Sequence, residues 1–473
     1  MVYNSNPKVS VVTMCRNAER TIRRCVESVL SQDYTNIEYI IQDGASTDRT
    51  LDIIKEYKDE RIKLVSEPDF GGASEAYLKG LRRCTGDIIG LCWADEEYFP
   101  HTVSWGVINL GKHPEVAAIY GDVYATDIDG NIPDGISNLS PGWDLLKFLC
   151  FEIVPHYCSS FFRTSKLKES GFFERTSSYF KSKTEPEGSV MYDYYAIVGI
   201  KYPILYIPGF VAKFAIHKDQ LSSTPAVLHS MVSELMRSFD SLCNTEKNTS
   251  SIIQLRYHAY AGFHLMMIPP FLSYAGAFED AKTMLKRALS YEPDINFLGK
   301  VVIDACNYLN GKGLSNELLE FSDIIIKAGL TIPNLNYARA VALCDLRRYE
   351  ETIASIRKEH ILQPMHAGFP ELEFKLQLHM LLETRQIRDV LNKGILAEYQ
   401  LREVANILNN LLTTTETGGI YHFLQGMSST ALASLEDVVN TCFLIASREG
   451  TQELINRLKA LAATIKAIRI TRA

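Results

Sequence analysis

The chain has 473 residues, of which 46% are hydrophobic and 22% are charged, and its formal net charge is −7. A chain of this length and apolar content is expected to form two or three folded domains, which excludes a disordered protein. The acidic balance argues against nucleic acid or an anionic membrane surface as the main partner, because both attract basic surfaces.

The cysteines and the N-terminal residues indicate the cellular compartment in which the protein is expected. The ten cysteines include no Cys-x-x-Cys pair, and several lie in apolar runs, so we expect reduced thiols and a cytoplasmic protein. The polar start, Met1 to Lys8, is unlike a signal peptide. The most apolar later stretch, His264 to Ala277, is interrupted by Pro269-Pro270 and is shorter than the ~20 residues of a membrane-spanning helix. We therefore predict a soluble protein, with peripheral association at the inner face of the membrane if its acceptor is lipid-linked.

The first hundred residues alternate between β-branched runs and helical patterns. Strands are predicted at 9–13, 37–42, 62–66 and 87–92, and amphipathic helices separate them. This order requires crossover connections, so it predicts an α/β domain with a mostly parallel central sheet.

Polar residues follow the carboxyl ends of these strands. They are Thr13 with Arg16, Asp43, Glu67 with Asp69, and Asp95. Ligands of parallel sheets bind beyond the carboxyl ends of the strands, so these groups are expected to converge on one crevice. The alternative interpretation is that they are ordinary polar loop residues.

The pattern changes after residue 117. Further strands are predicted at 119–124, 159–163, 204–207 and 211–216, and a helix at 191–198. From about residue 226 the chain is expected to be helical. Apolar spacing after Gly276, near Arg347 to Glu350 and around Ile387 resembles tetratricopeptide repeats with a period of ~35 residues, and an irregular helical bundle is the alternative. These patterns predict an α/β domain over residues 1–225 and an all-α, repeat-like domain over 226–473.

Short motifs occur in a fixed order through the first domain. They are Val9 to Thr13, Arg16-Asn17, Asp43-Gly44 to Asp48, Glu67-Pro68-Asp69, Lys79-Gly80, Gly86-Asp87 and Ala94-Asp95-Glu96. In order and spacing they resemble the family 2 glycosyltransferases of GT-A fold. The resemblance extends over roughly residues 7–222 and does not include the helical half of the chain.

This resemblance implies a nucleoside diphosphate sugar as the donor. Asp43 and Asp69 match the acids that bind the base and ribose, Thr13 is expected near the base, and Arg16 and Lys79 belong to the same donor-binding set. An ionised carboxylate accepts strongly from imide N–H groups and ribose hydroxyls. Without the resemblance, Asp43 is a turn former before a glycine and Arg16 a partner in a surface ion pair.

The segment after the fourth strand is the expected metal site. Residues 93–96 read Trp-Ala-Asp-Glu where the family has an Asp-x-Asp motif, so Trp93 replaces the first acid. A cation there, Mn²⁺ or Mg²⁺, neutralises the departing diphosphate. Asp95 is the expected principal ligand, Glu97 or Glu96 an additional one, and His217 a further candidate. The alternative is a solvated acidic turn.

Inversion at the anomeric carbon requires a base that takes the proton of the acceptor hydroxyl. The resemblance assigns this role to Asp193, within Tyr192-Asp193-Tyr194, and an ordinary surface acid is the alternative. His156 is a weaker candidate for the acceptor side.

Together these features predict an inverting, metal-dependent glycosyltransferase. It would move a sugar, with a UDP-sugar as the favoured donor, to a hydroxyl on a polysaccharide, a glycolipid precursor or a protein. The helical domain would hold the acceptor, form a homo-oligomer or bind a partner protein. Trp93 favours a rival hypothesis, a non-catalytic interaction protein with a degenerate transferase domain. A sugar nucleotidyltransferase is a second rival, which the absence of glycine from Thr13 to Asn17 disfavours.

Overall fold

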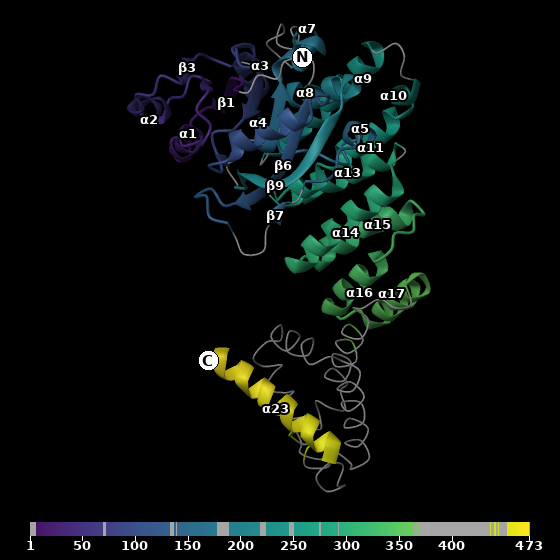
Figure 1. Cartoon of the computed structure of the whole chain (residues 1–473). Coiled ribbons are helices and arrows are strands. Elements are labelled where there is room, and N and C mark those ends of the chain that lie inside the picture. The colour runs from purple at the N-terminus through teal and green to yellow at the C-terminus, as the bar shows by residue number, and fades with distance from the viewer. Residues whose placement is uncertain are drawn as a thin grey trace. The chain divides into compact units, whose positions relative to one another are not determined.

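The computed structural model divides into two compact units, residues 1–301 and 302–473. Figure 1 traces the chain and its elements. The structure describes residues 6–363, a few single later positions and the helix at 452–472, except for short gaps inside the first range. These gaps are 70–71, 133–136, 139, 177–188, 218–223, 246–249, 274–275 and 292.

A mixed sheet organises the first unit (Figure 1). Its strands follow the order β3-β2-β1-β4-β8-β6-β9-β5, and β7 pairs with β6. The strands are β1 (Val9–Cys15), β2 (Ile37–Asp43), β3 (Ile62–Ser66), β4 (Ile88–Leu91), β5 (Glu97–Tyr98), β6 (Ala118–Thr126), β7 (Ser137–Asn138), β8 (Ser160–Arg163) and β9 (Ile204–Ala215).

Strands β1 to β4 form the parallel half of the sheet. In register, Cys15 lies opposite Asp43 and Asp43 opposite Ser66, so these strands end at one edge. Every residue of β1 and β2 is buried, as expected for parallel strands covered on both faces. The crossovers are made by α1 (Ile22–Leu30), α2 (Thr50–Glu56) and α3 (Gly72–Arg82). The predicted α/β class and the parallel arrangement of these strands are confirmed.

The other half of the sheet contains antiparallel pairs. Strand β8 lies between β4 and β6 and is antiparallel to both, whereas β9 is parallel to β6. The short strand β5 pairs with β9 through Glu97 opposite Lys213. Sequence periodicity did not indicate β5, because a strand this short contains no repeating pattern.

Helices surround the sheet and continue after it in the first unit. Helix α8 is buried over nearly its whole surface, from Val190 to Val198, as its apolar sequence requires. The helices are α4 (Thr102–Lys112), α5 (Leu145–Leu149), α6 (Thr164–Glu169), α7 (Phe172–Thr176), α8 (Val190–Lys201), α9 (Pro225–Thr245), α10 (Ser250–Gln254), α11 (Arg256–Leu265), α12 (Ile268–Ser273), α13 (Phe278–Leu289) and α14 (Ile295–Gly311), which extends into the second unit. No helix within the described part of the chain combines the length and apolar character that crossing a bilayer requires.

The described part of the second unit is helical, as predicted. It contains α15 (Ser315–Lys327), α16 (Leu335–Asp345), α17 (Tyr349–Leu362) and α23 (Gln452–Arg472). Gly313, Gly329 and Arg347 follow α14, α15 and α16 with positive φ angles of 70°, 73° and 61°. Gly313 and Arg347 are 34 positions apart, close to the predicted repeat. The repeat expected around Ile387 lies outside the described residues, and the tetratricopeptide identity stays a prediction.

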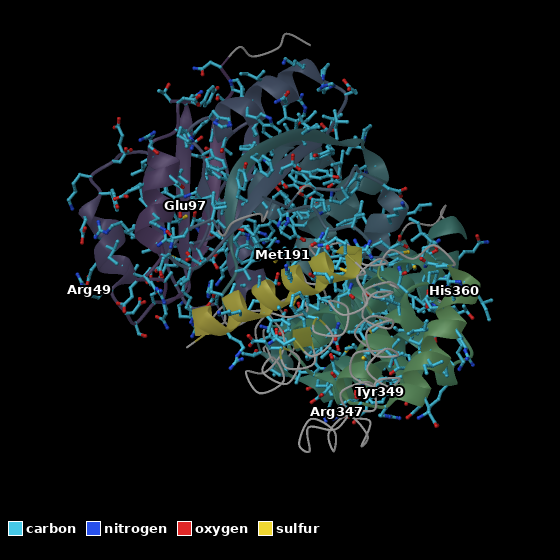
Figure 2. All side chains as sticks on the ribbon, turned by 90° about the horizontal axis from the view of Figure 1, so that it is seen from below. Arg49, Glu97, Met191, Arg347, Tyr349 and His360 are labelled. Atoms are coloured by element: carbon cyan, nitrogen blue, oxygen red, sulfur yellow. The ribbon has the colours of Figure 1, made fainter. Side chains whose placement is uncertain are left out.

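Helices α16 and α17 are joined by a polar contact as well as by apolar packing. The turn with Arg347 and Tyr349 lies at one end of this pair, and His360 near the far end of α17 (Figure 2). The Glu359 carboxylate, on α17, is fully buried and accepts the N–H groups of Asn334 and Asn336 at 2.6 and 3.0 Å. A side chain of α17 thus caps the start of α16, where backbone N–H groups have no partner within the helix.

Candidate active site

Asp43 is the buried centre of the parallel edge. It ends β2, and its side chain is fully enclosed. Its carboxylate accepts the Ser46 N–H at 3.0 Å, the Ser46 hydroxyl at 2.5 Å and the Ser66 hydroxyl at 2.6 Å. These three donors, together with the Cys15 thiol at 3.6 Å from Oδ1, hold the carboxylate in one orientation before any ligand arrives.

Asp69 lies directly over the residue that follows Asp43. A Cβ added at Gly44 would lie 2.6 and 2.7 Å from the two Asp69 carboxylate oxygens. Burial raises the pKa of Asp69, and the Arg16 guanidinium, whose Nη1 lies 3.4 Å from Oδ1, opposes that shift. The Arg16 side chain is 61% exposed, so it can contact an anionic ligand while remaining beside Asp69. The structure therefore brings three predicted donor-binding residues together.

Thr13 lies near the carboxyl end of β1 and inside the core. Its side chain is fully buried, and its hydroxyl donates to the Cys92 carbonyl oxygen at 2.5 Å and contacts the Tyr39 hydroxyl at 3.0 Å. Thr13 thus connects β1 with the neighbouring strands inside the core. The side chain lies on a covered face of the sheet, and the expected position of Thr13 near the base stays a prediction.

Lys79 lies on α3 and contacts the loop that contains Asp69. Its Nζ donates to the Pro68 carbonyl oxygen at 2.8 Å and lies 3.0 Å from Glu75 and 3.9 Å from Glu67. In this structure Lys79 holds the 67–69 loop, and its expected role in donor binding stays a prediction.

Asp95 and His217 form a close pair from two distant segments. Asp95 follows β4, His217 follows β9, and the Asp95 Oδ2 and His217 Nε2 atoms are 3.2 Å apart. Their side chains are 32% and 12% exposed. Glu96 turns inward instead, where its carboxyl accepts the Trp93 N–H at 2.8 Å, and burial and the neighbouring Asp95 charge raise its pKa.

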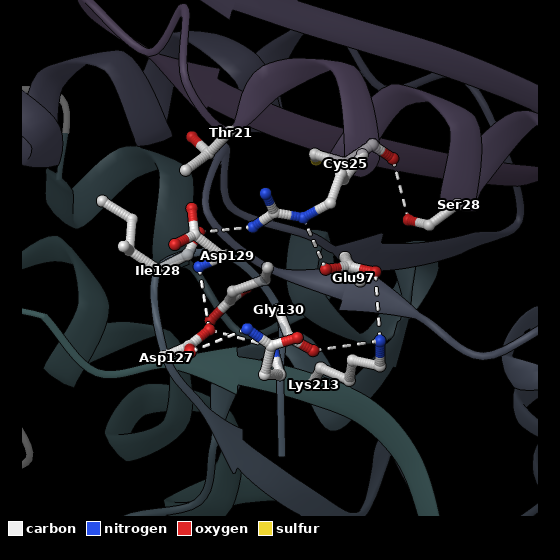
Figure 3. A network of polar contacts seen from close by, with 12 residues as sticks. Thr21, Cys25, Ser28, Glu97, Asp127, Ile128, Asp129, Gly130 and Lys213 are labelled. Carbon is white, nitrogen blue, oxygen red and sulfur yellow. Dashed lines mark hydrogen bonds and ion pairs between the residues drawn. The ribbon is translucent and has the colours of Figure 1, made fainter. Parts of the chain in front are cut away.

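Glu97, predicted as a metal ligand, lies elsewhere. One of its oxygens accepts from Arg24 Nε at 2.9 Å and the other lies 3.3 Å from Lys213 Nζ (Figure 3). Two cationic side chains therefore neutralise this carboxylate. The sequence suggested a ligand because Glu97 is near Asp95, but the strand geometry of β5 directs its side chain to Arg24 and Lys213.

Asp193 is enclosed near the start of α8. Its side chain has no exposed surface, and the Arg175 Nε atom of α7 lies 3.6 Å from its Oδ2. The next residue, Tyr194, packs edge-on against Tyr77 of α3 with 5.5 Å between ring centroids, and Tyr77 stacks on Trp93 at 6.4 Å. These rings join α8 to the loop after β4. Sequence reasoning missed Tyr77, whose position only tertiary packing determines, and Ser46, whose bond to Asp43 is a turn contact that the sequence could have suggested.

His156, the weaker acceptor-side candidate, packs against Phe214 with 5.0 Å between the rings. Burial lowers its pKa to about 4. The neutral imidazole is therefore the favoured form near neutral pH, which leaves one ring nitrogen as an acceptor.

The residues present can be tested against a metal ion. Within the described part of the chain, no three His, Cys, Asp or Glu side chains are grouped as metal ligands. Asp95 and His217 provide one carboxylate and one imidazole. Mg²⁺ and similar cations in phosphate-handling sites are commonly held by one or two protein groups together with substrate phosphates and water. The pair therefore fits a cation that a diphosphate helps to hold.

Sequence comparison relates this N-terminal part to known proteins. Residues 10–167 match the family model described as glycosyl transferase family 2. A Bacillus subtilis (strain 168) protein named as a glycosyltransferase, EpsE, is 41% identical over 113 residues, which are 23% of this chain and 41% of that protein. The Escherichia coli protein named UDP-Glc:alpha-D-GlcNAc-diphosphoundecaprenol beta-1,3-glucosyltransferase WfaP is 38% identical over 116 residues, 24% of this chain and 46% of that protein. The chain thus spans less than half the length of each of these relatives.

Structural comparison finds weaker likenesses. Staphylococcus aureus TarS 1–349 aligns with 74% of this chain and 91% of its own, with 15% identity and a TM-score of 0.43. The mannosyltransferase PcManGT from Pyrobaculum calidifontis, solved in complex with GDP-Man and Mn²⁺, aligns with 77% of this chain and 89% of its own, with 16% identity and a TM-score of 0.40. The sequence matches are the stronger finding.

Proposed function

The chain contains a glycosyl transferase family 2 domain over residues 10–167, and from this premise we propose that it transfers a sugar from a nucleoside diphosphate sugar to a hydroxyl acceptor. The proposal depends on one observation. Asp43 with Asp69 on one side, and Asp95 with His217 on the other, flank the carboxyl end of β1, which lies between β2 and β4. Such an edge is where parallel sheets bind nucleotides.

On this proposal the nucleoside binds at Asp43 and Asp69, and Arg16 contacts the charged part of the donor. An oriented carboxylate favours a ligand with a base N–H or a ribose hydroxyl over an analogue that lacks this donor. We favour a UDP-sugar as the donor, supported by the name of the relative WfaP. The acceptor would be a polysaccharide, a lipid-linked sugar or a protein.

Asp95 and His217 would hold Mn²⁺ or Mg²⁺ together with the donor diphosphate. Such a cation neutralises the charge that develops on the leaving diphosphate. Glu97 is not part of this proposed ligand set, because Arg24 and Lys213 already pair with its carboxylate.

Asp193 is the proposed base of an inverting transfer. A base must come within hydrogen-bond reach of the acceptor hydroxyl, and free-enzyme geometry alone does not exclude a candidate. Its carboxylate is near Arg175 and fully enclosed, so this role requires the acceptor complex to open a path to it. We further propose that residues 1–225 form the transferase domain and that the helical residues 226–473 bind the acceptor, a second copy or a partner protein.

Donor binding to the full chain tests the proposal. Isothermal titration with UDP, GDP and their sugars, with and without Mn²⁺, should show binding of at least one nucleotide that Mn²⁺ strengthens. Asp95→Asn and His217→Ala should each reduce the gain in nucleotide affinity that Mn²⁺ provides by about tenfold or more. Glu56→Gln, which removes an exposed carboxylate on α2 paired with Arg23, is the matched control and should bind normally.

The outcomes distinguish the rival functions. Binding of no nucleotide sugar would contradict the proposal and favour an interaction protein. Release of pyrophosphate from a nucleoside triphosphate and a sugar phosphate would favour a nucleotidyltransferase. Hydrolysis or transfer of the sugar from a nucleoside diphosphate sugar would support a glycosyltransferase.

A further inference from the structure

Glu97 and Lys213 face each other where two distant segments of the chain meet. They are directly paired in register on β5 and β9, and the Lys213 Nζ lies 3.3 Å from the Glu97 Oε2. Asp95 precedes Glu97 by two positions, and His217 follows Lys213 by four. The pairing of β5 with β9 therefore connects the segment that contains Asp95 to the segment that contains His217.

The second oxygen of Glu97 is bound from α1. Arg24 Nε donates to it at 2.9 Å, and Arg24 Nη2 donates to the Ile128 carbonyl oxygen at 2.6 Å (Figure 3). The side chains of Arg24, Glu97 and Lys213 are only 29%, 17% and 25% exposed. At this depth an ion pair is less screened than on the surface, and two cations that share one carboxylate lose less conformational freedom per contact than two isolated pairs.

A closed turn packs against the same carboxylate. Asp127 accepts the N–H groups of Asp129 and Asn131, both at 2.9 Å, and Gly130 has a φ of 83°. A Cβ at Gly130 would lie 2.6 Å from Glu97 Oε1, and Lys213 Nζ lies 3.4 Å from the Gly130 carbonyl oxygen. The turn therefore leaves Glu97 little room to move.

We propose that Glu97 is a positioning residue that sets the separation of Asp95 and His217. Strand β5 has two residues, so backbone bonds alone hold it weakly against β9. The ion pairs of Glu97 with Lys213 and Arg24 supply the additional attachment. This inference rests on the proposed function, in which Asp95 and His217 bind the cation and diphosphate. Groups that orient metal ligands typically change metal affinity by about 10–100-fold when they are removed.

The test measures Mn²⁺ affinity of the full chain at saturating UDP, from the paramagnetic resonance signal of free Mn²⁺. Glu97→Gln and Lys213→Met should each raise the Mn²⁺ dissociation constant by about tenfold. The double variant should bind Mn²⁺ no more weakly than the single variant with the lower Mn²⁺ affinity. Both changes break the same Glu97 and Lys213 contact, so their effects should not add. Lys213→Arg retains the positive charge, so its Mn²⁺ dissociation constant should stay within about twofold of that of the natural protein.

Controls separate this inference from the proposed function. Arg20→Gln removes the exposed pair with Asp129 at the same turn and should leave Mn²⁺ affinity unchanged. If Asp95→Asn loses Mn²⁺ while a folded Glu97→Gln keeps full affinity, the positioning role is wrong and the proposed function stands. If Asp95→Asn also keeps full affinity, the proposed metal site itself is wrong. If Glu97→Gln does not fold, the Mn²⁺ affinities of Lys213→Met and Lys213→Arg test the inference instead. Equal Mn²⁺ affinities of these two variants would overturn it.

Discussion

The Cα of Gly44 lies so close to the Asp69 carboxylate that a methyl group at position 44 would stand 2.6 Å from Oδ2. Gly44 directly follows Asp43, and Asp69 lies in the loop after the neighbouring strand β3. The missing side chain is therefore what lets two acids from different strands lie together at the proposed nucleoside site. Even a methyl group at position 44 would disturb this contact, so substitution of Gly44 by alanine tests the proposed site.

Gly44→Ala should push the Asp69 carboxylate away and weaken UDP binding by about tenfold, since overpacking of this kind costs about 1–3 kcal/mol. Titration calorimetry with UDP measures the change. Gly142→Ala is the control, because a Cβ at that position meets nothing within 4 Å. Equal UDP affinity of the two variants would show that the Gly44 and Asp69 contact does not form part of the donor site.

Asp193→Asn should separate binding from transfer. The amide occupies the same space as the carboxylate but cannot take a proton, so transfer should fall by about 10²-fold or more while UDP affinity is retained. A radiolabelled-sugar transfer assay and UDP titration measure the two properties. A variant with normal turnover would rule out Asp193 as the base. Normal UDP affinity with lost transfer would also show that the change is not a folding defect.

Trp93→Asp restores the missing acid of the metal motif, yet it should not strengthen Mn²⁺ binding. The side chain at position 93 faces the Tyr77 ring, with 6.4 Å between centroids and an interplanar angle of 15°, whereas the proposed ligand pair is Asp95 with His217. Trp93→Phe, which retains the stacked ring, is the matched control and should keep the natural melting temperature more closely than Trp93→Asp. A stronger Mn²⁺ affinity in Trp93→Asp would show instead that residue 93 lies within reach of the cation.

His156 should make the protein less stable in mild acid. Burial lowers its pKa from 6.5 to about 4, so between these values the unfolded chain binds more protons than the folded one. Stability is therefore present above pH 6.5 and is lost as the pH falls through this window, by up to about 3 kcal/mol. His156→Gln should show a smaller loss of urea stability between pH 7.5 and pH 4.5 than the natural protein. The exposed His101→Gln is the control, and an equal pH dependence in all three proteins would contradict the prediction.

Glu359→Ala should destabilise the second unit, because it removes a buried carboxylate and leaves the N–H groups of Asn334 and Asn336 without this acceptor. The expected loss of unfolding free energy is about 1–3 kcal/mol. Urea unfolding followed by circular dichroism measures it. Glu351→Ala, which removes an exposed pair with Arg348 on the same helix, should leave the unfolding midpoint unchanged. Equal midpoints in the two variants would show that the cap contributes nothing.

The amino-acid sequence by itself determined the parallel half of the sheet and the residues at its edge. Each of β1 to β4 is a local apolar run, and their alternation with helical patterns requires the crossovers that make neighbouring strands parallel. Parallel strands end at the same edge, so the closeness of Asp43 and Asp69 followed from their positions at the end of β2 and in the loop after β3. The proximity of Arg16 followed in the same way.

Tertiary structure decided what depends on distant partners and on the face that a side chain occupies. The strand β5 exists only because it pairs with β9, 116 positions away at Glu97 and Lys213, and that pairing directs Glu97 away from Asp95. Thr13 is buried because its face of β1 is covered, and Asp193 is enclosed because α7 lies against α8. No local sequence pattern contains this information. Each of these contacts joins two separate segments of the chain, and the order of the segments does not specify which of them meet in space.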